Sequence, residues 1–191
     1  NQILKDAHPA NSILLRGISE KPKLPSFADQ YKLTSACIAS YPMYRGLASL
    51  AGMDVLETGM TVPDEVATLK EQFGNYTYTF FHVKKTDSYG EDGNFDAKAK
   101  VIEEVDSLIP DILNLNPDVL AICADHSSPA ACSAHSWHPV PLLIHAKHSF
   151  IDDATRYTER EAAKGILGHL EGKELMPLLL AHAGKLNKYG A

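Results

Sequence analysis

The sequence contains few cysteines and no surplus of basic residues, and each shortage excludes a class of protein. Its three cysteines, Cys37, Cys123 and Cys132, are an odd number without the spacing of a disulfide framework. We therefore expect free thiols in a reducing compartment. With 18 basic against 24 acidic residues, the chain has a net charge of -6 and offers no basic surface to nucleic acid or to an anionic membrane.

Long apolar runs are also absent. No run approaches the length that spans a bilayer, and no charged segment followed by an apolar one opens the chain. These features favour a soluble, cytoplasmic protein. What is present is an ordinary globular balance, with 45% hydrophobic and 22% charged residues. The length of 191 residues suffices for one well-buried domain, or for a domain and a fragment of another.

Strand-like and helical patterns alternate along the chain, which predicts an α/β fold with a mainly parallel sheet flanked by helices. The apolar run at 119–123 is uninterrupted, as is typical of a parallel strand covered on both faces. A proline-rich connector at 21–25 is the best candidate for a domain boundary. The predicted strands are 11–15, 35–40, 76–82, 119–123 and 140–144, and the predicted helices are 43–51, 62–73, 95–113, 158–167 and 175–186.

The segment 82–93 follows a predicted strand, so it lies at the edge of the sheet where α/β proteins bind ligands. It carries two carboxylates four residues apart, Asp87 and Glu91, bracketed by Gly90 and Gly93. The glycines permit tight turns and a close approach of the backbone to a ligand. The alternative interpretation is a charged surface turn.

Two further segments offer the same chemistry. Asp125 and His126 directly follow the strand-like run 119–123, and His135 lies in the next loop. Carboxylate and imidazole are the donors that Mn²⁺ and Zn²⁺ favour, and carboxylates also suit Mg²⁺. Taken singly, Asp125 could cap a helix, His126 could be a core histidine and His135 a surface residue. Because all three segments would converge on one rim of the sheet, we expect a metal site there.

Four motifs in this order resemble the archaeal-type cofactor-independent phosphoglycerate mutases, a family of the alkaline phosphatase superfamily. The motifs are HVKKTDSYGEDG at 82–93, ADHSSP at 124–129, HSWHPVP at 135–141 and KYGA at 188–191. The resemblance implies an alkaline phosphatase-like core and an enzyme that interconverts 3-phosphoglycerate and 2-phosphoglycerate in glycolysis. The reaction would pass through a phosphoserine intermediate and need no 2,3-bisphosphoglycerate.

The resemblance also implies two divalent metal ions, Mn²⁺ or Mg²⁺, with Zn²⁺ as a further option. One ion would be held by Asp87, the residue at position 91 and His135. The other would be held by Asp125 and His126 with ligands from elsewhere. The family usually has histidine where this sequence has Glu91, and an anionic donor in place of a neutral one changes the preference for the metal.

Arg16 and Arg45 are candidates to bind the carboxylate or the phosphate of the substrate, because a guanidinium group forms planar bidentate contacts with both. Lys84 and Lys85 would add positive potential nearby. The alternative is that both arginines and both lysines are solvated surface residues.

The sequence departs from the family pattern because the early aspartate-rich motif and the nucleophilic serine do not occur in it. Ser88, Ser127 and Ser128 lie near the predicted ligands, but none matches a nucleophile motif. We therefore expect a C-terminal portion of a mutase with an incomplete core, inactive without its N-terminal segment and weak in its second metal site. Residues 1–25 would be the remnant of an inserted substrate-binding domain, and residues 26–191 part of the metal-binding domain.

Two other interpretations stay open at this point. The chain could belong to another enzyme of the superfamily, a phosphate-ester hydrolase or one resembling phosphonopyruvate decarboxylase. It could also be a non-catalytic, metal-stabilised module that pairs with another chain or associates with itself through exposed strands.

Overall fold

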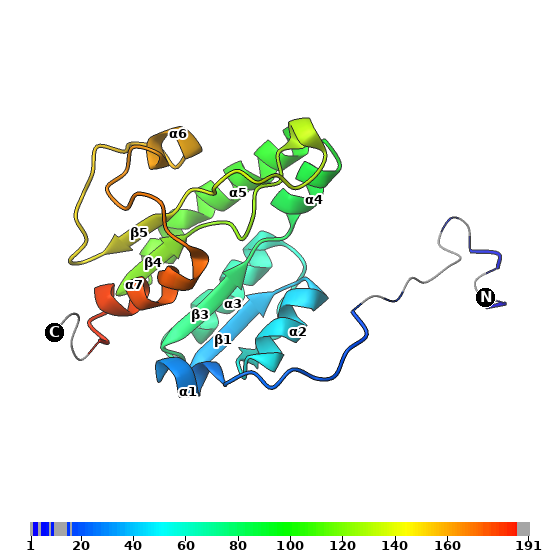
Figure 1. Ribbon diagram of the computed structural model, residues 1–191, viewed down its shortest axis with the longest axis horizontal. Helices are drawn as coiled ribbons and strands as arrows, with labels where there is room; N and C mark the ends of the chain where they lie inside the picture. The colour runs from blue at the N-terminus through cyan, green and yellow to red at the C-terminus, as the bar shows by residue number, and fades with distance from the viewer. Residues whose placement is uncertain (1, 4, 8, 10–14, 16, 187–191) are drawn as a thin grey trace.

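The computed structural model describes residues 2–3, 5–7, 9, 15 and 17–186. The predicted strand at 11–15 falls almost wholly outside these residues, as do Arg16 and the motif at 188–191. Two groups of strands, each accompanied by helices, make up the fold (Figure 1). The expected α/β fold with a parallel sheet flanked by helices is confirmed.

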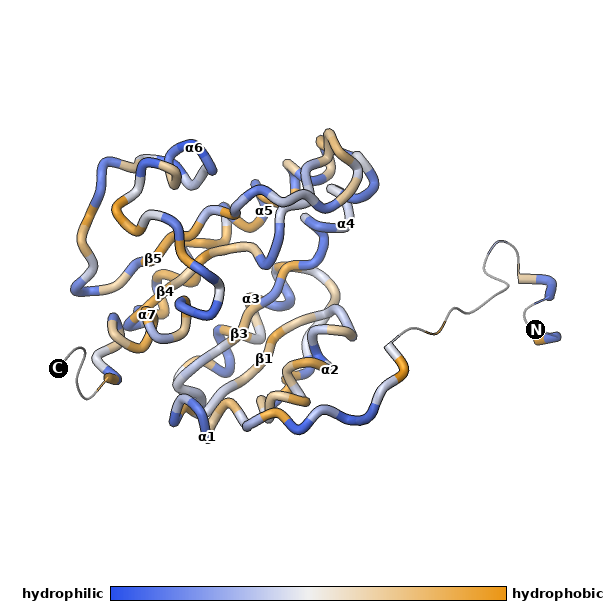
Figure 2. The backbone as a smooth tube through the Cα atoms, viewed as in Figure 1, coloured by the Kyte–Doolittle hydropathy of each residue, from blue (hydrophilic) through white to orange (hydrophobic). Residues whose placement is uncertain are grey.

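The parallel sheet has three strands, with β1 (Ser35–Ala39) between β2 (Asp54–Val55) and β3 (Tyr78–His82). Every residue of β1 is buried, because α2 (Pro42–Leu50) and α3 (Val62–Gln72) both pack against it. Side chains of a strand alternate between its faces, so Cys37 and Ala39 share one face, where they cluster with Ala48 of α2. Figure 2 shows the apolar character of β1 at the centre of this unit.

Local signals explain the helices around the sheet. A short helix, α1 (Phe27–Tyr31), begins at the side-chain cap Ser26. Thr61 and Asp64 form a capping box at the start of α3, and Pro63 lies between them in the first turn. The long helix α5 (Phe95–Leu113) has the predicted bounds and packs on α3. Its apolar stripe is only partly covered, since Val101 is buried whereas Ile102 is 51% exposed.

The second pair of strands corrects the prediction of a parallel strand at 119–123. Strand β4 (Val119–Ile122) pairs with β5 (Leu143–Ala146), and the pairing is antiparallel and half-exposed. Parallel strands are usually joined by a crossover helix, whereas the link here contains only the 3₁₀ turn η1 (Ala130–Cys132). β5 begins later than predicted because Pro139 and Pro141 have no N–H group to donate to a ladder.

Three helical segments also differ from prediction. The segment after β3 is a short helix, α4 (Lys85–Glu91), where a turn was expected. The helix predicted at 158–167 is the single turn α6 (Glu159–Ala162), because the chain soon reaches Gly165 and Gly168. After the 3₁₀ turn η2 (Gly172–Glu174), the last helix is α7 (Leu175–His182), which is shorter than predicted because Gly184 follows with a positive φ of 65°.

The three cysteines are free thiols, as expected, with Cys37 buried and Cys123 and Cys132 exposed. Among the residues that the structure describes, no helix combines the length and apolar character needed to cross a membrane.

Glu65 of α3 gives the fold a testable dependence on pH. Its side chain is 2% exposed and accepts a hydrogen bond of 3.0 Å from the Ser40 N–H at the end of β1. Burial raises the pKa of this carboxyl above its usual value of 4.5, and the bonds from Ser40 only partly oppose this. A raised pKa in the folded state stabilises the fold below pH 4.5, and this contribution is lost as the pH rises through the folded-state pKa.

Glu65→Gln is therefore expected to gain stability relative to the wild type as the pH rises above 4.5. Urea unfolding at a series of pH values measures the difference. Glu71→Gln, at an exposed position of the same helix, is the matched control. Its free energy of unfolding should differ from that of the wild type by the same amount at every pH. A constant offset between Glu65→Gln and wild type at all pH values would contradict the account.

Candidate metal centre

The predicted ligands come together from three segments of the chain. Helix α4, which follows β3, carries Asp87 and Glu91, and the loop after β4 carries Asp125 and His126. His135 lies in the loop between η1 and β5. An isolated bridge between Ser127 and Ser136 holds these two loop segments side by side. The convergence expected from the sequence is therefore found in the structure.

Asp87 is at the centre of this cluster. Its Oδ1 lies 3.8 Å from His126 Nε2 and 3.5 Å from His135 Nε2. One donor atom from each of these three residues lies within 4.8 Å of the other two. An ion that sits about 2 Å from each of its nitrogen and oxygen ligands fits among donors at such separations. The chemistry of the donor set, one carboxylate and two imidazoles, suits a divalent transition metal.

Glu91 and Asp125 each lie beside one of the two histidines of the central trio. Glu91 Oε1 lies 3.3 Å from His135 Nε2, and Asp125 Oδ2 lies 3.6 Å from His126 Nε2. The five predicted ligands thus form a continuous chain of donors. The central trio takes members from both predicted ligand sets, so the division between two ions stays a prediction.

Hydrogen-bond donors hold both aspartates in their ionised forms. Burial raises the pKa of Asp87, but hydrogen bonds from the Lys84 ammonium and the Ser128 hydroxyl outweigh burial, and its pKa is lowered. Asp125 behaves alike: burial raises its pKa, the Tyr44 hydroxyl lowers it, and the result is a lowered pKa. Two ionised carboxylates beside two imidazoles form a region that attracts a cation.

Tyr44 and Ser128 contact the predicted ligands, and the sequence did not predict these contacts. The Tyr44 ring stacks on His82 with 3.8 Å between ring centroids, while its hydroxyl donates to Asp125. Burial lowers the pKa of His82, and its buried Nδ1 has no hydrogen-bond partner in the described part of the chain. Ser128 contacts Asp87 and His126 through its hydroxyl. No motif marks Tyr44, and only the nearness of Ser128 to His126 in sequence hinted at its position.

The two arginines predicted to bind substrate have different outcomes. Arg16 lies outside the described residues. The Arg45 guanidinium donates to the backbone carbonyls of Ala39, at 3.3 Å, and Leu56, at 2.8 Å, and forms an ion pair of 2.6 Å with Glu57. These contacts join the ends of β1 and β2. A role for Arg45 toward substrate stays a prediction.

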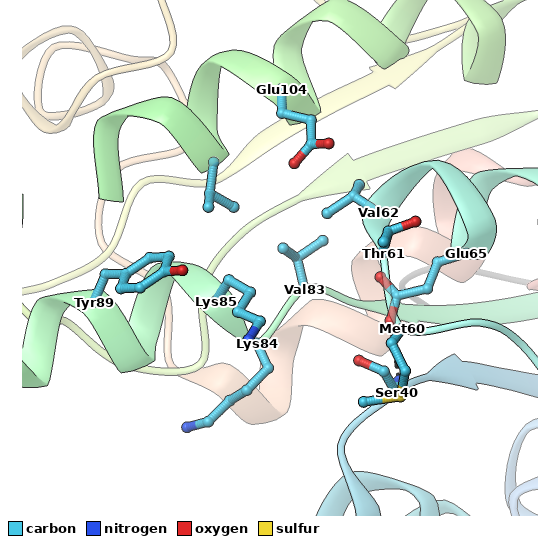
Figure 3. Close-up of a pocket in the computed structure, with 11 residues that line it drawn as sticks. Ser40, Met60, Thr61, Val62, Glu65, Val83, Lys84, Lys85, Tyr89 and Glu104 are labelled. Atoms are coloured by element: carbon cyan, nitrogen blue, oxygen red, sulfur yellow. Dashed lines mark hydrogen bonds between the residues drawn. The ribbon is translucent and has the colours of Figure 1, made fainter. Parts of the chain in front are cut away.

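A cavity of about 210 Å³ adjoins the cluster at the carboxyl ends of β1 and β3 (Figure 3). Ser40 and Val83 line it from the strand ends, while Lys85 and Tyr89 line it from α4. Lys84 belongs both to the lining and to the cluster, since its ammonium contacts Asp87. The cavity therefore lies beside the candidate metal ligands, and Glu65 and Glu104 also line it.

Comparison with known families assigns the chain to a superfamily. The model of the Metalloenzyme superfamily matches residues 6–182, which include the predicted ligands. The chain belongs to the Metalloenzyme superfamily. Members of a metalloenzyme family use metal ions, in agreement with the donor chemistry of the cluster.

Curated relatives carry the name that the sequence motifs suggested. Over 193 residues the chain is 58% identical to a probable 2,3-bisphosphoglycerate-independent phosphoglycerate mutase of Thermus thermophilus, covering all of this chain and 48% of the relative. It is 55% identical over 190 residues to a protein of the same name from Thermotoga petrophila, covering all of this chain and 47% of the relative. The chain therefore spans about half the length of the curated relatives it matches.

Solved structures confirm the fold. The PH0037 protein of Pyrococcus horikoshii superposes with a TM-score of 0.83 at 32% identity, over 87% of this chain and 46% of that one. The cofactor-independent phosphoglycerate mutase of Thermoplasma acidophilum gives a TM-score of 0.69 at 20% identity, over 85% of this chain and 40% of that one. The predicted resemblance to cofactor-independent phosphoglycerate mutases is confirmed by the curated relatives, and the solved structures show the fold.

Proposed function

We propose that this chain is the metal-binding part of a phosphoglycerate mutase that interconverts 3-phosphoglycerate and 2-phosphoglycerate in glycolysis, in the cytoplasm, without 2,3-bisphosphoglycerate. The observation that carries the proposal is the cluster of Asp87, His126 and His135, whose donor atoms lie within 4.8 Å of one another. The high identity to relatives named as mutases supports the reaction.

Each residue of the cluster has a distinct part in this proposal. Asp87, His126 and His135 would hold a divalent ion, Mn²⁺ or Mg²⁺, while Glu91 and Asp125 would extend the ligand set toward a second one. A bound divalent ion polarises a phosphoryl group and stabilises the attacking and leaving oxygens. Lys84 keeps Asp87 ionised and adds positive charge on the side of the cavity. Arg45 and Arg16 are proposed to bind the anionic ends of the substrate.

The remainder of the enzyme would complete the site. In the described part of the chain, β3 and β4 each pair with a neighbour on one side, and they do not pair with each other. Both strands lead into segments that carry ligands. We propose that the further segment present in the longer relatives pairs with these open strands, and that it supplies the nucleophilic serine and the ligands that the second ion still needs.

The test is an assay of the complete protein with 3-phosphoglycerate and Mn²⁺, followed by ³¹P NMR. We expect 2-phosphoglycerate to form without added 2,3-bisphosphoglycerate, and the reaction to stop on addition of a chelator and to resume when Mn²⁺ is restored. Release of inorganic phosphate without 2-phosphoglycerate would contradict the mutase and favour a hydrolase. Unchanged substrate would contradict both reactions.

A further inference from the structure

The Ser128 hydroxyl connects two proposed metal ligands that lie far apart in the sequence. It donates a hydrogen bond to Asp87 Oδ1, and its oxygen lies 3.1 Å from His126 Nδ1. Ser128 is 5% exposed, so water does not compete for these contacts. A buried hydroxyl with two such partners fixes the orientation of both.

The single hydroxyl proton of Ser128 determines which ring nitrogen of His126 carries a proton. A serine hydroxyl has one proton to donate, and Ser128 donates it to Asp87 Oδ1. Because the proton of Ser128 is used on Asp87, the bond to His126 needs its proton from Nδ1. A neutral imidazole with its proton on Nδ1 has a free lone pair on Nε2.

That lone pair is on the side of the carboxylates. His126 Nε2 lies 3.8 Å from Asp87 Oδ1 and 3.6 Å from Asp125 Oδ2. A metal ligand needs an unprotonated nitrogen at this position, and a hydrogen bond at the other ring nitrogen is the usual way to secure it. The Nε2–H form would instead present a proton to the ion.

Two contacts at its carbonyl oxygen hold Ser128 in place. The Lys98 ammonium of α5 donates to its carbonyl oxygen at 2.7 Å. Gly90 of α4 lies so close that a Cβ there would be 2.2 Å from the same oxygen. The position of the hydroxyl is thus fixed by the packing of α4 and α5 against the loop after β4.

We infer that Ser128 is a positioning residue, which holds His126 in its Nδ1–H tautomer and links it to Asp87, so that the two predicted ligand sets are ordered together. The inference rests on the proposed function, because a metal ion is what uses the Nε2 lone pair. The tautomer itself is a property of the metal-free chain and is measured separately.

Long-range ¹H–¹⁵N NMR of the histidine rings, at pH about 8.5 where an ordinary imidazole is neutral, reads the tautomer without metal. We expect His126 to carry its proton on Nδ1 in the wild type and in Ser128→Thr, which retains the hydroxyl. Ser128→Ala should populate the Nε2–H form. Ser127→Ala, the neighbouring serine whose hydroxyl is not used here, should match the wild type. An Nε2–H wild type, or an Nδ1–H Ser128→Ala, would overturn the inference.

Titration of the same chains with Mn²⁺, and with Co²⁺ monitored by its visible absorption, gives a second measurement. Ser128→Ala is expected to bind about 10- to 100-fold more weakly and with an altered Co²⁺ spectrum, and Ser128→Thr to restore both. Equal affinity and spectrum in Ser128→Ala would contradict the positioning role. Failure of the wild type to bind either metal would overturn the proposed function, while the tautomer would still decide the role of Ser128.

Discussion

Replacement of Asp87 by asparagine is expected to weaken binding of Mn²⁺ by more than about 100-fold, since loss of an outer-shell contact alone typically costs 10- to 100-fold. Asp87 is the carboxylate that both His126 and His135 approach, so it supplies the negative charge of the central trio. Asparagine retains an oxygen that accepts from Ser128 but removes the negative charge. The mutase activity proposed for the complete protein should fall to the same degree.

A matched control separates the loss of a ligand from the loss of a surface charge. Asp92 follows α4, is exposed, and permits the same substitution five residues away. Asp92→Asn should bind Mn²⁺ as the wild type does. Circular dichroism checks that Asp87→Asn is folded, because the substitution leaves the partly buried Lys84 without its counter-charge. Folded Asp87→Asn with wild-type affinity would exclude Asp87 as a ligand.

Substitution of Gly90 by alanine is expected to destabilise the fold by about 3 kcal/mol, the upper part of the usual range for overpacking. The added Cβ would lie 2.2 Å from the carbonyl oxygen of Ser128 and 3.0 Å from its Cβ. The carbonyl is backbone and cannot rotate away, so α4 or the loop after β4 has to move. Urea unfolding measures the change in free energy.

Gly46 of α2 provides the opposite case. It is also a helical glycine, but a Cβ there would meet nothing within 4 Å. Gly46→Ala is therefore expected to stabilise the fold by about 0.5–1 kcal/mol, through the better helix propensity of alanine. If Gly90→Ala were as stable as Gly46→Ala, the close packing of α4 on Ser128 would be disproved.

The parts of the fold that were predicted correctly are those with strong local signals. Helix α5 has nineteen residues of helical periodicity between Asn94, which caps it, and Asn114. Helix α3 begins at a capping box with a proline in its first turn. Such signals act over a few residues and do not depend on the rest of the molecule.

The direction of β4 relative to its partner could not be predicted in the same way. An uninterrupted apolar run indicates burial, but it does not specify which strand lies alongside. The pairing of β4 with β5 is decided by the link between them, which contains one 3₁₀ turn and no crossover helix. The expected coverage on both faces was wrong for the same reason.

In the candidate site, too, the residues with local sequence signals were predicted and the contacts set by tertiary packing were not. Asp87, Asp125 and His126 could be found because they follow strand-like runs and have the chemistry of metal ligands. The contacts of Tyr44 and Ser128 could not, because their partners lie 81 and 41 residues away in the sequence. Supporting contacts of this kind are set by tertiary packing and leave no periodic pattern in the chain.

The most direct test of the metal site is a crystal structure of this chain with Mn²⁺, with anomalous scattering to locate the ion. We expect a peak between Asp87, His126 and His135, with each donor atom about 2 Å from the ion. Weaker density beside Asp125 would fit a second site that lacks part of its ligand set. A Mn²⁺ ion bound elsewhere, with none among these three residues, would contradict the account.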